Sequence, residues 1–342
     1  MRTAIVLMTH RFDPSILAEF ERMRAALHAG DRAFVLSDAE ELPDDLAAPV
    51  HRFTLGRVAT RAKRLVGHEI MWNLHLAWLD FFDAHADFDH YWFIEYDAVY
   101  AGPWRDLFDA FRDQPHDLFC AHLRRHAEEP DWHWWHEIHP PDGVLDPASC
   151  VRGFLPIARL SRHGFAVLRD QVRAGWSGFF EGLLPTLLHL QGLRIGDFGG
   201  DGAFVPEGFR ERFYTSASDR AGSLHNLGTH RFRPPLAYPR ILPGRIYHPV
   251  KPESCLVDAG VDDVERSGAA IANALEQIRQ RRQQRAASGT RDVDLDTVLQ
   301  ALTGLDVPTL RNAIERHVEA TAGDHRFILL RQRLERLVDA AA

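Results

Sequence analysis

The sequence has little cysteine, no long apolar segment near its start and no excess of basic charge. Its three cysteines, Cys120, Cys150 and Cys255, are far apart and form no CxxC pair, so neither a disulfide framework nor a zinc ribbon is indicated. The apolar run before Thr9 has only about six residues, shorter than a signal-peptide core or a membrane span. We therefore expect a cytoplasmic protein in a reducing compartment, without a transmembrane segment.

Charge and missing motifs exclude several classes of function. The chain has 40 Lys and Arg against 48 Asp and Glu, a net charge of −8, which argues against a protein that binds nucleic acid through its phosphates. It contains no G-x-x-x-x-G-K-[ST] motif, no G-x-G-x-x-G motif after the first predicted strand and no G-x-S-x-G motif. P-loop, Rossmann dinucleotide and α/β-hydrolase sites are therefore not indicated.

Strand and helix patterns alternate along the first part of the chain. Apolar runs predict strands, and apolar residues at spacings of three and four predict helices, the first of them beginning at Pro14. The predicted strands are residues 3–8, 33–36, 91–94 and 118–123, and the predicted helices include residues 14–30, 69–84 and 106–111. This alternation indicates an α/β fold with a mostly parallel sheet and helices on both of its faces.

The composition changes near residue 258. The length predicts about two domains, and we place them at residues 1–257, an α/β body, and residues 258–342, an all-helical C-terminal extension. The amphipathic helices of the extension favour either packing on the body or a homodimer formed through them.

Polar residues follow the first two predicted strands. In open α/β sheets, ligands bind beyond the carboxyl ends of the strands, so Thr9, His10 and Asp38 are candidates for a ligand site. The alternative is that they are ordinary loop residues.

The strongest single feature is the sequence WFIEYD at residues 92–97. Glu95 and Asp97 come at the end of a buried strand, and alternation along an extended chain places them on one face, with Tyr96 opposite. Paired carboxylates bind hard cations such as Mg²⁺ or Mn²⁺, which suit a nucleotide diphosphate. Two solvated acids at a strand end are the alternative.

A second candidate motif is YHPVK at residues 247–251. A neutral imidazole at His248 completes a metal site begun by two carboxylates, and the ammonium of Lys251 is a compact charge for a phosphate oxygen. A surface His-Pro turn is the alternative.

Two acids are candidates for a general base. Glu181 precedes an apolar helix and has aromatic neighbours, which would desolvate its carboxyl group and raise its pKa. Asp201 lies in a glycine-rich stretch where a ligand approaches the backbone closely. A glutamate that merely stabilises a helix start is the alternative for Glu181.

The stretch at residues 131–139 is rich in tryptophan and histidine. The faces of Trp132, Trp134 and Trp135 suit the C–H faces of sugar rings, which predicts acceptor binding. Ordinary packing and a zinc site are the alternatives, although the stretch does not fit the H-E-x-x-H pattern. The zinc ligands would be His133, His136 and His139.

These motifs together resemble the GT-A class of nucleotide-sugar glycosyltransferases over residues 1–255. The segments YWFIEYDAVYAGPW and IYHPVK are similar to a little-characterised glycosyltransferase-like group found in bacteria, fungi and plants. The resemblance implies a GT-A-like sheet and transfer of a sugar from a nucleotide diphosphate donor to an acceptor hydroxyl. The expected partners are thus a nucleotide sugar and a glycan or hydroxyl acceptor.

The resemblance also implies roles for single residues. Glu95 and Asp97 stand at the DxD site of the class, with Glu95 in place of the usual first Asp; His248 matches its late metal-binding histidine, with Lys251 on the diphosphate. Mn²⁺ or Mg²⁺ is the implied cofactor.

The spacing of Glu181 and Thr186 is similar to the E-x-x-x-x-T arrangement around the base of core-2 branching transferases, which invert the anomeric centre. Our first hypothesis is therefore an inverting transferase for a bacterial-type glycan. A carbohydrate-binding scaffold without turnover and a metal-dependent hydrolase are the alternatives.

Overall fold

The computed structural model describes residues 1–44, 46, 48–215, 229–232 and 243–251. The chain divides into two units: Met1–Ala98 with Pro103–Thr215, and Val99–Gly102 with Ser216–Ala342. The expected domain boundary after residue 257, the C-terminal helices and any dimer formed through them lie outside the described residues.

The first unit is built around a seven-stranded sheet with the order β10-β6-β8-β4-β1-β2-β3. Parallel pairs join β4, β1, β2 and β3, and another joins β10 and β6, whereas β8 runs antiparallel to both β4 and β6. The predicted mostly parallel sheet is therefore confirmed, with β8 as the exception. The strands are β1 Thr3–Met8, β2 Arg32–Ser37, β3 Val50–Arg52, β4 His90–Glu95, β6 Leu118–Arg125, β8 Val151–Ser161 and β10 Ile195–Asp197.

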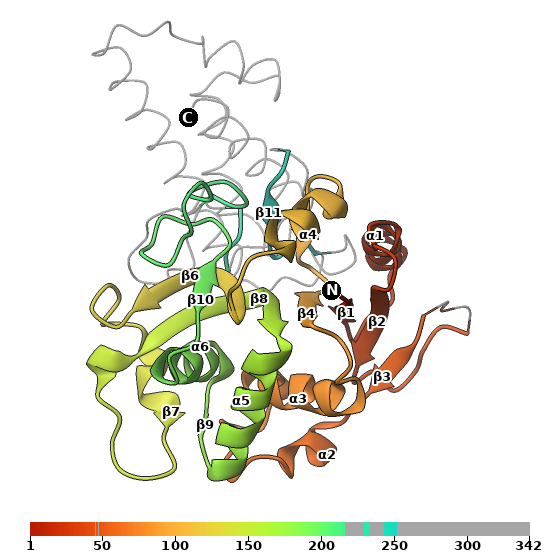
Figure 1. Ribbon diagram of the computed structural model, residues 1–342. Helices are drawn as coiled ribbons and strands as arrows, with labels where there is room; N and C mark the ends of the chain where they lie inside the picture. Colours follow the sequence, from red (N-terminus) through yellow and green to blue (C-terminus); the bar gives the residue numbers. More distant parts are fainter. Residues whose placement is uncertain (45, 47, 216–228, 233–242, 252–342) are drawn as a thin grey trace, which may run out of the picture. The chain divides into compact units, whose positions relative to one another are not determined.

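Helices cover both faces of this sheet, as predicted. α1 and α4 lie on one face, and α3, α5 and α6 pack together on the other (Figure 1). The helices are α1 Pro14–Ala25, α2 Leu55–Ala59, α3 Leu74–Ala84, α4 Trp104–Arg112, α5 Arg162–Ala174 and α6 Phe180–Leu190. Shorter elements are the 3-10 turns η1 Ile70–Trp72, η2 His133–Glu137 and η3 Pro147–Ser149 and the strands β5 Val99–Tyr100, β7 Ile138–His139, β9 Ser177–Gly178 and β11 Ile246–Tyr247.

Aromatic rings bury strand β4 on both faces. On one face, Phe93 stacks on Trp78 of α3, with ring centroids 4.6 Å apart. On the other, Trp92 contacts Phe108 of α4, with centroids 5.2 Å apart. A strand buried on both faces has a continuous apolar sequence, which is why residues 91–94 contain only aromatic and aliphatic side chains and no charge.

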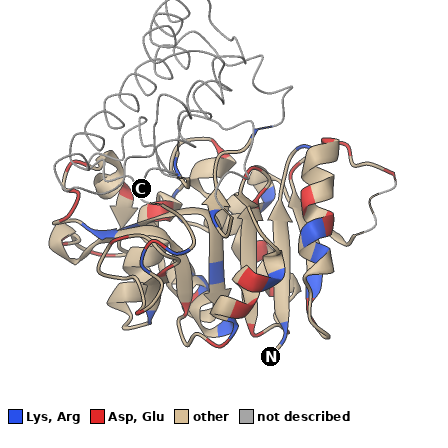
Figure 2. Ribbon diagram, turned by 90° about the horizontal axis from the view of Figure 1, so that it is seen from above, with Lys and Arg blue, Asp and Glu red and all other residues tan. Residues whose placement is uncertain are grey.

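Charged residues lie mainly on the helices and loops. Figure 2 shows basic and acidic residues interleaved over the described elements.

Among the described helices, none combines the length and the apolar character that crossing a lipid bilayer requires.

One predicted helix is interrupted. The expected helix over residues 69–84 divides at Asn73 into the short turn η1 and the helix α3. The Asn73 amide donates to the carbonyl of Val66 (2.8 Å) and accepts from its N–H (3.0 Å). An asparagine side chain bonded to the backbone in this way competes with helical hydrogen bonds, and this competition is not visible in apolar spacing.

A buried histidine in α3 links the stability of this unit to pH. His75 is 1% exposed, and neither of its ring nitrogens has a hydrogen-bond partner among the described residues. Burial disfavours the charged ring and lowers the pKa of His75 from 6.5 to about 3. Between these two values the unfolded chain binds more protons than the folded one, so stability falls as the pH falls below 6.5.

We expect the free energy of unfolding at pH 5 to be lower than at pH 7.5, with His75 contributing about 2 kcal/mol to the difference. The variant His75→Leu should lose that contribution, because leucine does not titrate. His68→Leu, at an exposed position, is the matched control and should keep the wild-type pH dependence. Denaturant unfolding at both pH values measures the effect, and an unchanged pH dependence in His75→Leu contradicts it.

Candidate functional site

The carboxyl ends of three neighbouring parallel strands place several predicted site residues at one edge of the sheet. Thr9 and His10 follow β1, Asp38 follows β2, and Glu95 ends β4. The chain runs from β1 to β2 on one side and returns to β4 on the other, so β1 lies at a topological switch point, where open α/β sheets bind ligands. The ring of His10 meets that of Tyr96 edge to face, with centroids 5.1 Å apart.

The three residues after β1 and β2 differ in environment. Thr9 is buried; its hydroxyl oxygen accepts from the N–H of Arg11 (3.0 Å) and its hydroxyl donates to the Arg11 carbonyl. Thr9 therefore shapes the turn after β1. His10 and Asp38 are exposed at the same edge.

The acids after β4 lie in a turn. The N–H of Tyr96 still donates to the carbonyl of Met8 (2.9 Å), but the N–H of Ala98 donates back to the carbonyl of Glu95 (2.9 Å). The extended strand therefore stops at Glu95. The side-chain alternation expected over Glu95, Tyr96 and Asp97 does not apply, because Asp97 lies in the turn that follows. Glu95 is half-buried and Asp97 is 2% exposed.

His248 belongs to the second unit, where β11 pairs antiparallel with β5 and Tyr247 lies opposite Val99. The His248 Nδ1 atom lies 2.7 Å from the carbonyl oxygen of Arg231. Because a carbonyl only accepts, Nδ1 carries the proton, which leaves the lone pair of a neutral ring on Nε2. A hydrogen bond of this kind is what orients metal-binding histidines.

Glu95, Asp97 and His248 each offer one ligand atom, which gives two carboxylate oxygens and an imidazole nitrogen. Carboxylates suit Mg²⁺ and Mn²⁺, and an added imidazole favours the transition metal of the two. Lys251, the last residue of the YHPVK motif, is half-buried.

Glu181 is the second residue of α6 and reaches the sheet. Its Oε1 atom accepts from the N–H of Leu155 in β8 (3.2 Å). The pairing of β4 with β8, continued by one residue, places Glu95 opposite Pro156. The Glu181 carboxylate therefore binds β8 one residue away from the position opposite Glu95.

A tryptophan packs against the first turn of α6. A Cβ atom built on Gly182 would lie 2.9 Å from Ile138 Cδ1 and 3.1 Å from the Trp132 ring. The absence of a side chain at Gly182 thus lets the Trp132 indole pack against the first turn of α6, in which Glu181 also lies. Trp132 also contacts the ring of buried Phe179 at the helix start, with centroids 5.9 Å apart.

Asp201 is held differently. Its carboxylate forms an ion pair with Arg124, and its carbonyl accepts from Arg210. The side chain of Asp201 is 40% exposed. With an oxygen occupied by a guanidinium, Asp201 is a weaker candidate for the base than Glu181.

The other two tryptophans of the stretch also pack. Trp134 stacks on Phe179 with centroids 4.4 Å apart, and the Trp135 indole N–H donates to the carbonyl of Glu129 (2.8 Å). All three tryptophans are half-buried, so each retains exposed surface.

The histidines of this stretch do not form a metal site. His133 stacks on Trp134 with centroids 4.2 Å apart, and the Nε2 atom of His139 lies 3.1 Å from a Glu137 oxygen. Within the described residues, His133, His136 and His139 do not gather as a group of metal ligands. The zinc alternative therefore has no structural support.

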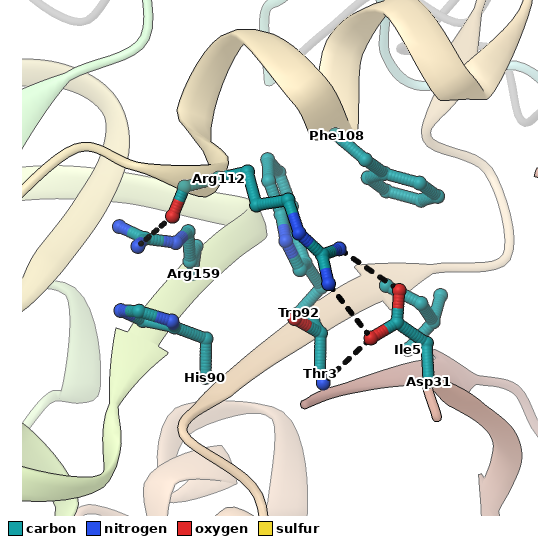
Figure 3. Close-up of a pocket in the computed structure, with 8 residues that line it drawn as sticks. All are labelled: Thr3, Ile5, Asp31, His90, Trp92, Phe108, Arg112 and Arg159. Atoms are coloured by element: carbon teal, nitrogen blue, oxygen red, sulfur yellow. Dashed lines mark hydrogen bonds and ion pairs between the residues drawn. The ribbon is translucent and has the colours of Figure 1, made fainter. Parts of the chain in front are cut away.

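A small pocket lies at the opposite edge of the sheet, at the first residues of β1 and β4 (Figure 3). Asp31 pairs there with Arg112 (3.0 Å) and accepts from the N–H of Thr3 (2.9 Å). The volume of this pocket, about 10 Å³, has room for about one water molecule and is too small for a nucleotide sugar.

Sequence reasoning missed Asp197, which ends β10. Its Oδ1 atom accepts from the N–H groups of Gly199 and Gly200 (3.0 and 3.1 Å) and from the Tyr214 hydroxyl (2.7 Å), and Oδ2 accepts from the N–H of Leu123 (2.9 Å). It is fully buried. An acid at a strand end, two residues before a Gly-Gly pair, was the available signal.

Comparison with known proteins gives no family assignment. No family model matches the chain, and no curated protein matches it. A solved structure of the galactosyltransferase LgtC, in complex with donor and acceptor sugar analogs, is similar at 11% identity over 61% of this chain and 74% of that chain, with a TM-score of 0.34.

The mannosyltransferase PcManGT from Pyrobaculum calidifontis, in complex with GDP-Man and Mn²⁺, is similar at 11% identity over 99% of this chain and 86% of that chain, again with a TM-score of 0.34. The bifunctional glycosyltransferase WbbM is similar at 12% identity over 55% of this chain and 36% of that chain, with a TM-score of 0.32. Scores this low do not establish a shared fold.

The contact between Trp132 and α6 predicts a difference between two glycine variants. Gly56 lies in helix α2 with no atom within 4 Å of a built Cβ, so Gly56→Ala should stabilise the protein by up to about 1 kcal/mol. Gly182→Ala should lack this gain, because its Cβ displaces Trp132 or Ile138. Denaturant unfolding compares the two, and equal stabilisation contradicts the packing described.

Proposed function

We propose that this protein is a glycosyltransferase of GT-A type, which moves a sugar from a nucleotide diphosphate to an acceptor hydroxyl of a glycan with inversion at the anomeric carbon. The observation that carries the proposal is the arrangement of carboxylates at one sheet edge. Glu95 ends a central strand at the switch point, Asp97 follows it, and Glu181 binds the adjacent strand one residue from the position opposite Glu95.

Glu95, Asp97 and His248 are the proposed ligands of Mn²⁺ or Mg²⁺. The donor set and the oriented Nε2 atom of His248 support this assignment. A bound divalent cation would neutralise charge on the departing diphosphate.

The remaining predicted residues have roles on the donor. Lys251 is proposed to bind a diphosphate oxygen, since an ammonium is a compact point charge. Thr9, His10 and Asp38 line the edge beside Glu95, where the nucleoside would lie.

Glu181 is proposed as the general base. It takes the proton of the acceptor hydroxyl as that oxygen bonds to the anomeric carbon and the bond from that carbon to the diphosphate oxygen breaks. Its hydrogen bond to Leu155 fixes one carboxylate oxygen. Trp132, which packs against Gly182 in the same helical turn, is proposed with Trp134 and Trp135 to bind the acceptor sugar through exposed ring surface.

The metal assignment predicts metal-dependent nucleotide binding. Calorimetry with UDP and GDP should show binding of one of them in Mn²⁺ that weakens on chelation. Asp97→Ala and His248→Ala should weaken that binding by at least about tenfold, because each removes a ligand atom. Asp142→Ala, at an exposed loop position, is the control and should bind as the wild type does.

Wild-type protein that binds neither nucleotide in Mn²⁺ contradicts the transferase and favours a scaffold. Wild-type binding together with full binding by Asp97→Ala contradicts only the metal site.

The base assignment predicts a loss of turnover without a loss of donor binding. Glu181→Gln should lower kcat by roughly 10² to 10⁴-fold, because the amide does not accept the proton, and should leave Mn²⁺-dependent nucleotide binding unchanged. Asp201→Asn should retain activity. Release of nucleotide diphosphate from a panel of UDP- and GDP-sugars measures the rate, and a reversal of the two variants would assign the base to Asp201.

A further inference from the structure

His122 interrupts strand β6 in a left-handed backbone conformation. Its φ is +50°, which is uncommon for a residue with a side chain. The pairing of β6 with β8 shifts register on both sides of Ala121. Such an irregularity changes the direction of a side chain and is frequent beside active sites.

A buried hydrogen-bond network holds this conformation. The N–H of His122 donates to the hydroxyl oxygen of Tyr214 (2.9 Å), and that hydroxyl donates to Asp197 (2.7 Å). The next N–H, of Leu123, donates to the other oxygen of the same carboxylate (2.9 Å). Asp197 and Tyr214 are both fully buried. Strained residues persist where the surroundings over-determine them, and they cluster at functional sites.

His122 lies at the same edge of the sheet as Glu95. β6 and β4 both run antiparallel to β8 and therefore point the same way. Phe119 of β6 and Trp92 of β4 are both paired with Arg159, so they lie level with each other. Beyond this point the register of β6 shifts: Ala121, the residue before His122, pairs with Phe154, whereas Glu95 continues the β4 pairing opposite Pro156. His122 and Glu95 therefore flank β8 at positions offset along the strand, with roughly 10 Å between β6 and β4.

The segment of β8 between them binds the carboxylate of Glu181, which comes from helix α6. Leu155, whose N–H binds the Glu181 carboxylate, follows Phe154, and the Phe154 ring lies 6.0 Å from that of His122. Three groups from separate elements, His122, Glu181 and Glu95, thus border one short stretch of strand. In the proposed reaction the transferred sugar lies between the diphosphate near Glu95 and the acceptor near Glu181.

The imidazole is suited to a sugar in this position. It is half-buried, with the Tyr214 ring 4.8 Å away. A neutral imidazole has one donor and one acceptor, which matches a sugar hydroxyl, and neighbouring aromatic rings suit the C–H face of the same sugar.

We propose that His122 hydrogen-bonds a hydroxyl of the donor sugar and is a specificity-determining residue of the transfer, an inference that rests on the proposed function. The backbone of this position would favour glycine, which adopts positive φ without a steric penalty. The presence of histidine instead is explained by substrate binding, at a cost to stability.

The test compares two positions with the same backbone strain. Glu211 also has a positive φ, of +54°, and has no role in the proposed reaction. His122→Gly and Glu211→Gly should both raise Tm. Only His122→Gly should lower kcat/KM for the nucleotide sugar, by at least about tenfold, because the site loses a hydrogen bond to the substrate. Binding of the free nucleotide in Mn²⁺ should not change.

A panel of deoxy-sugar donors separates direct contact from a structural role. The wild type should discriminate against the donor that lacks the contacted hydroxyl, and His122→Gly should lose this discrimination. His122→Asn, which also tolerates positive φ, serves if the glycine variant fails to fold.

Two failures are distinguishable. If the wild type turns over no nucleotide sugar, the proposed function is wrong and the role of His122 falls with it. If the wild type is active and His122→Gly keeps both its efficiency and its discrimination, only the inference about His122 is overturned.

Discussion

The burial of strand β4 on both faces is the constraint from which the rest of the arrangement follows. Aromatic side chains from α3 and α4 cover the two faces, so the strand tolerates no charge until it leaves the sheet. Glu95 is the first residue at which a carboxylate reaches solvent, and Asp97 follows within the turn. The acids are therefore placed at the edge by the packing of the residues before them.

Local patterns predicted most of the first unit. The strands β1, β2, β4 and β6 and the helix that begins at Pro14 appear where apolar runs and helical spacing indicated them. The direction of β8 was not predictable. An apolar run indicates a strand but not whether it runs parallel or antiparallel to its neighbours, and residues 126–150 before it do not have the pattern of a crossover helix. The division at Asn73 depends on two bonds to Val66, which apolar periodicity does not register.

The candidate site, too, was predictable from the sequence only in part. Acids and a histidine at predicted strand ends were visible in the sequence, because the carboxyl ends of parallel strands share an edge. The group formed by Asp197, Tyr214 and His122 was not, since it joins three segments through hydrogen bonds that no spacing rule relates. The sequence already put Glu181 ahead of Asp201 through its spacing to Thr186, and the partners of the two acids, Leu155 and Arg124, add a physical reason for that order.

The bonds of Asp31 at the amino-terminal edge have a mechanical consequence. Its carboxylate ties the start of β1 to Arg112 at the end of α4, and the same arginine donates to the carbonyl of Met1 (2.8 Å). Charge-assisted hydrogen bonds thus join β1 and α4 at the amino-terminal edge of the sheet. Local opening of the backbone is therefore expected to be rarest at this end of the sheet, where several elements are tied together.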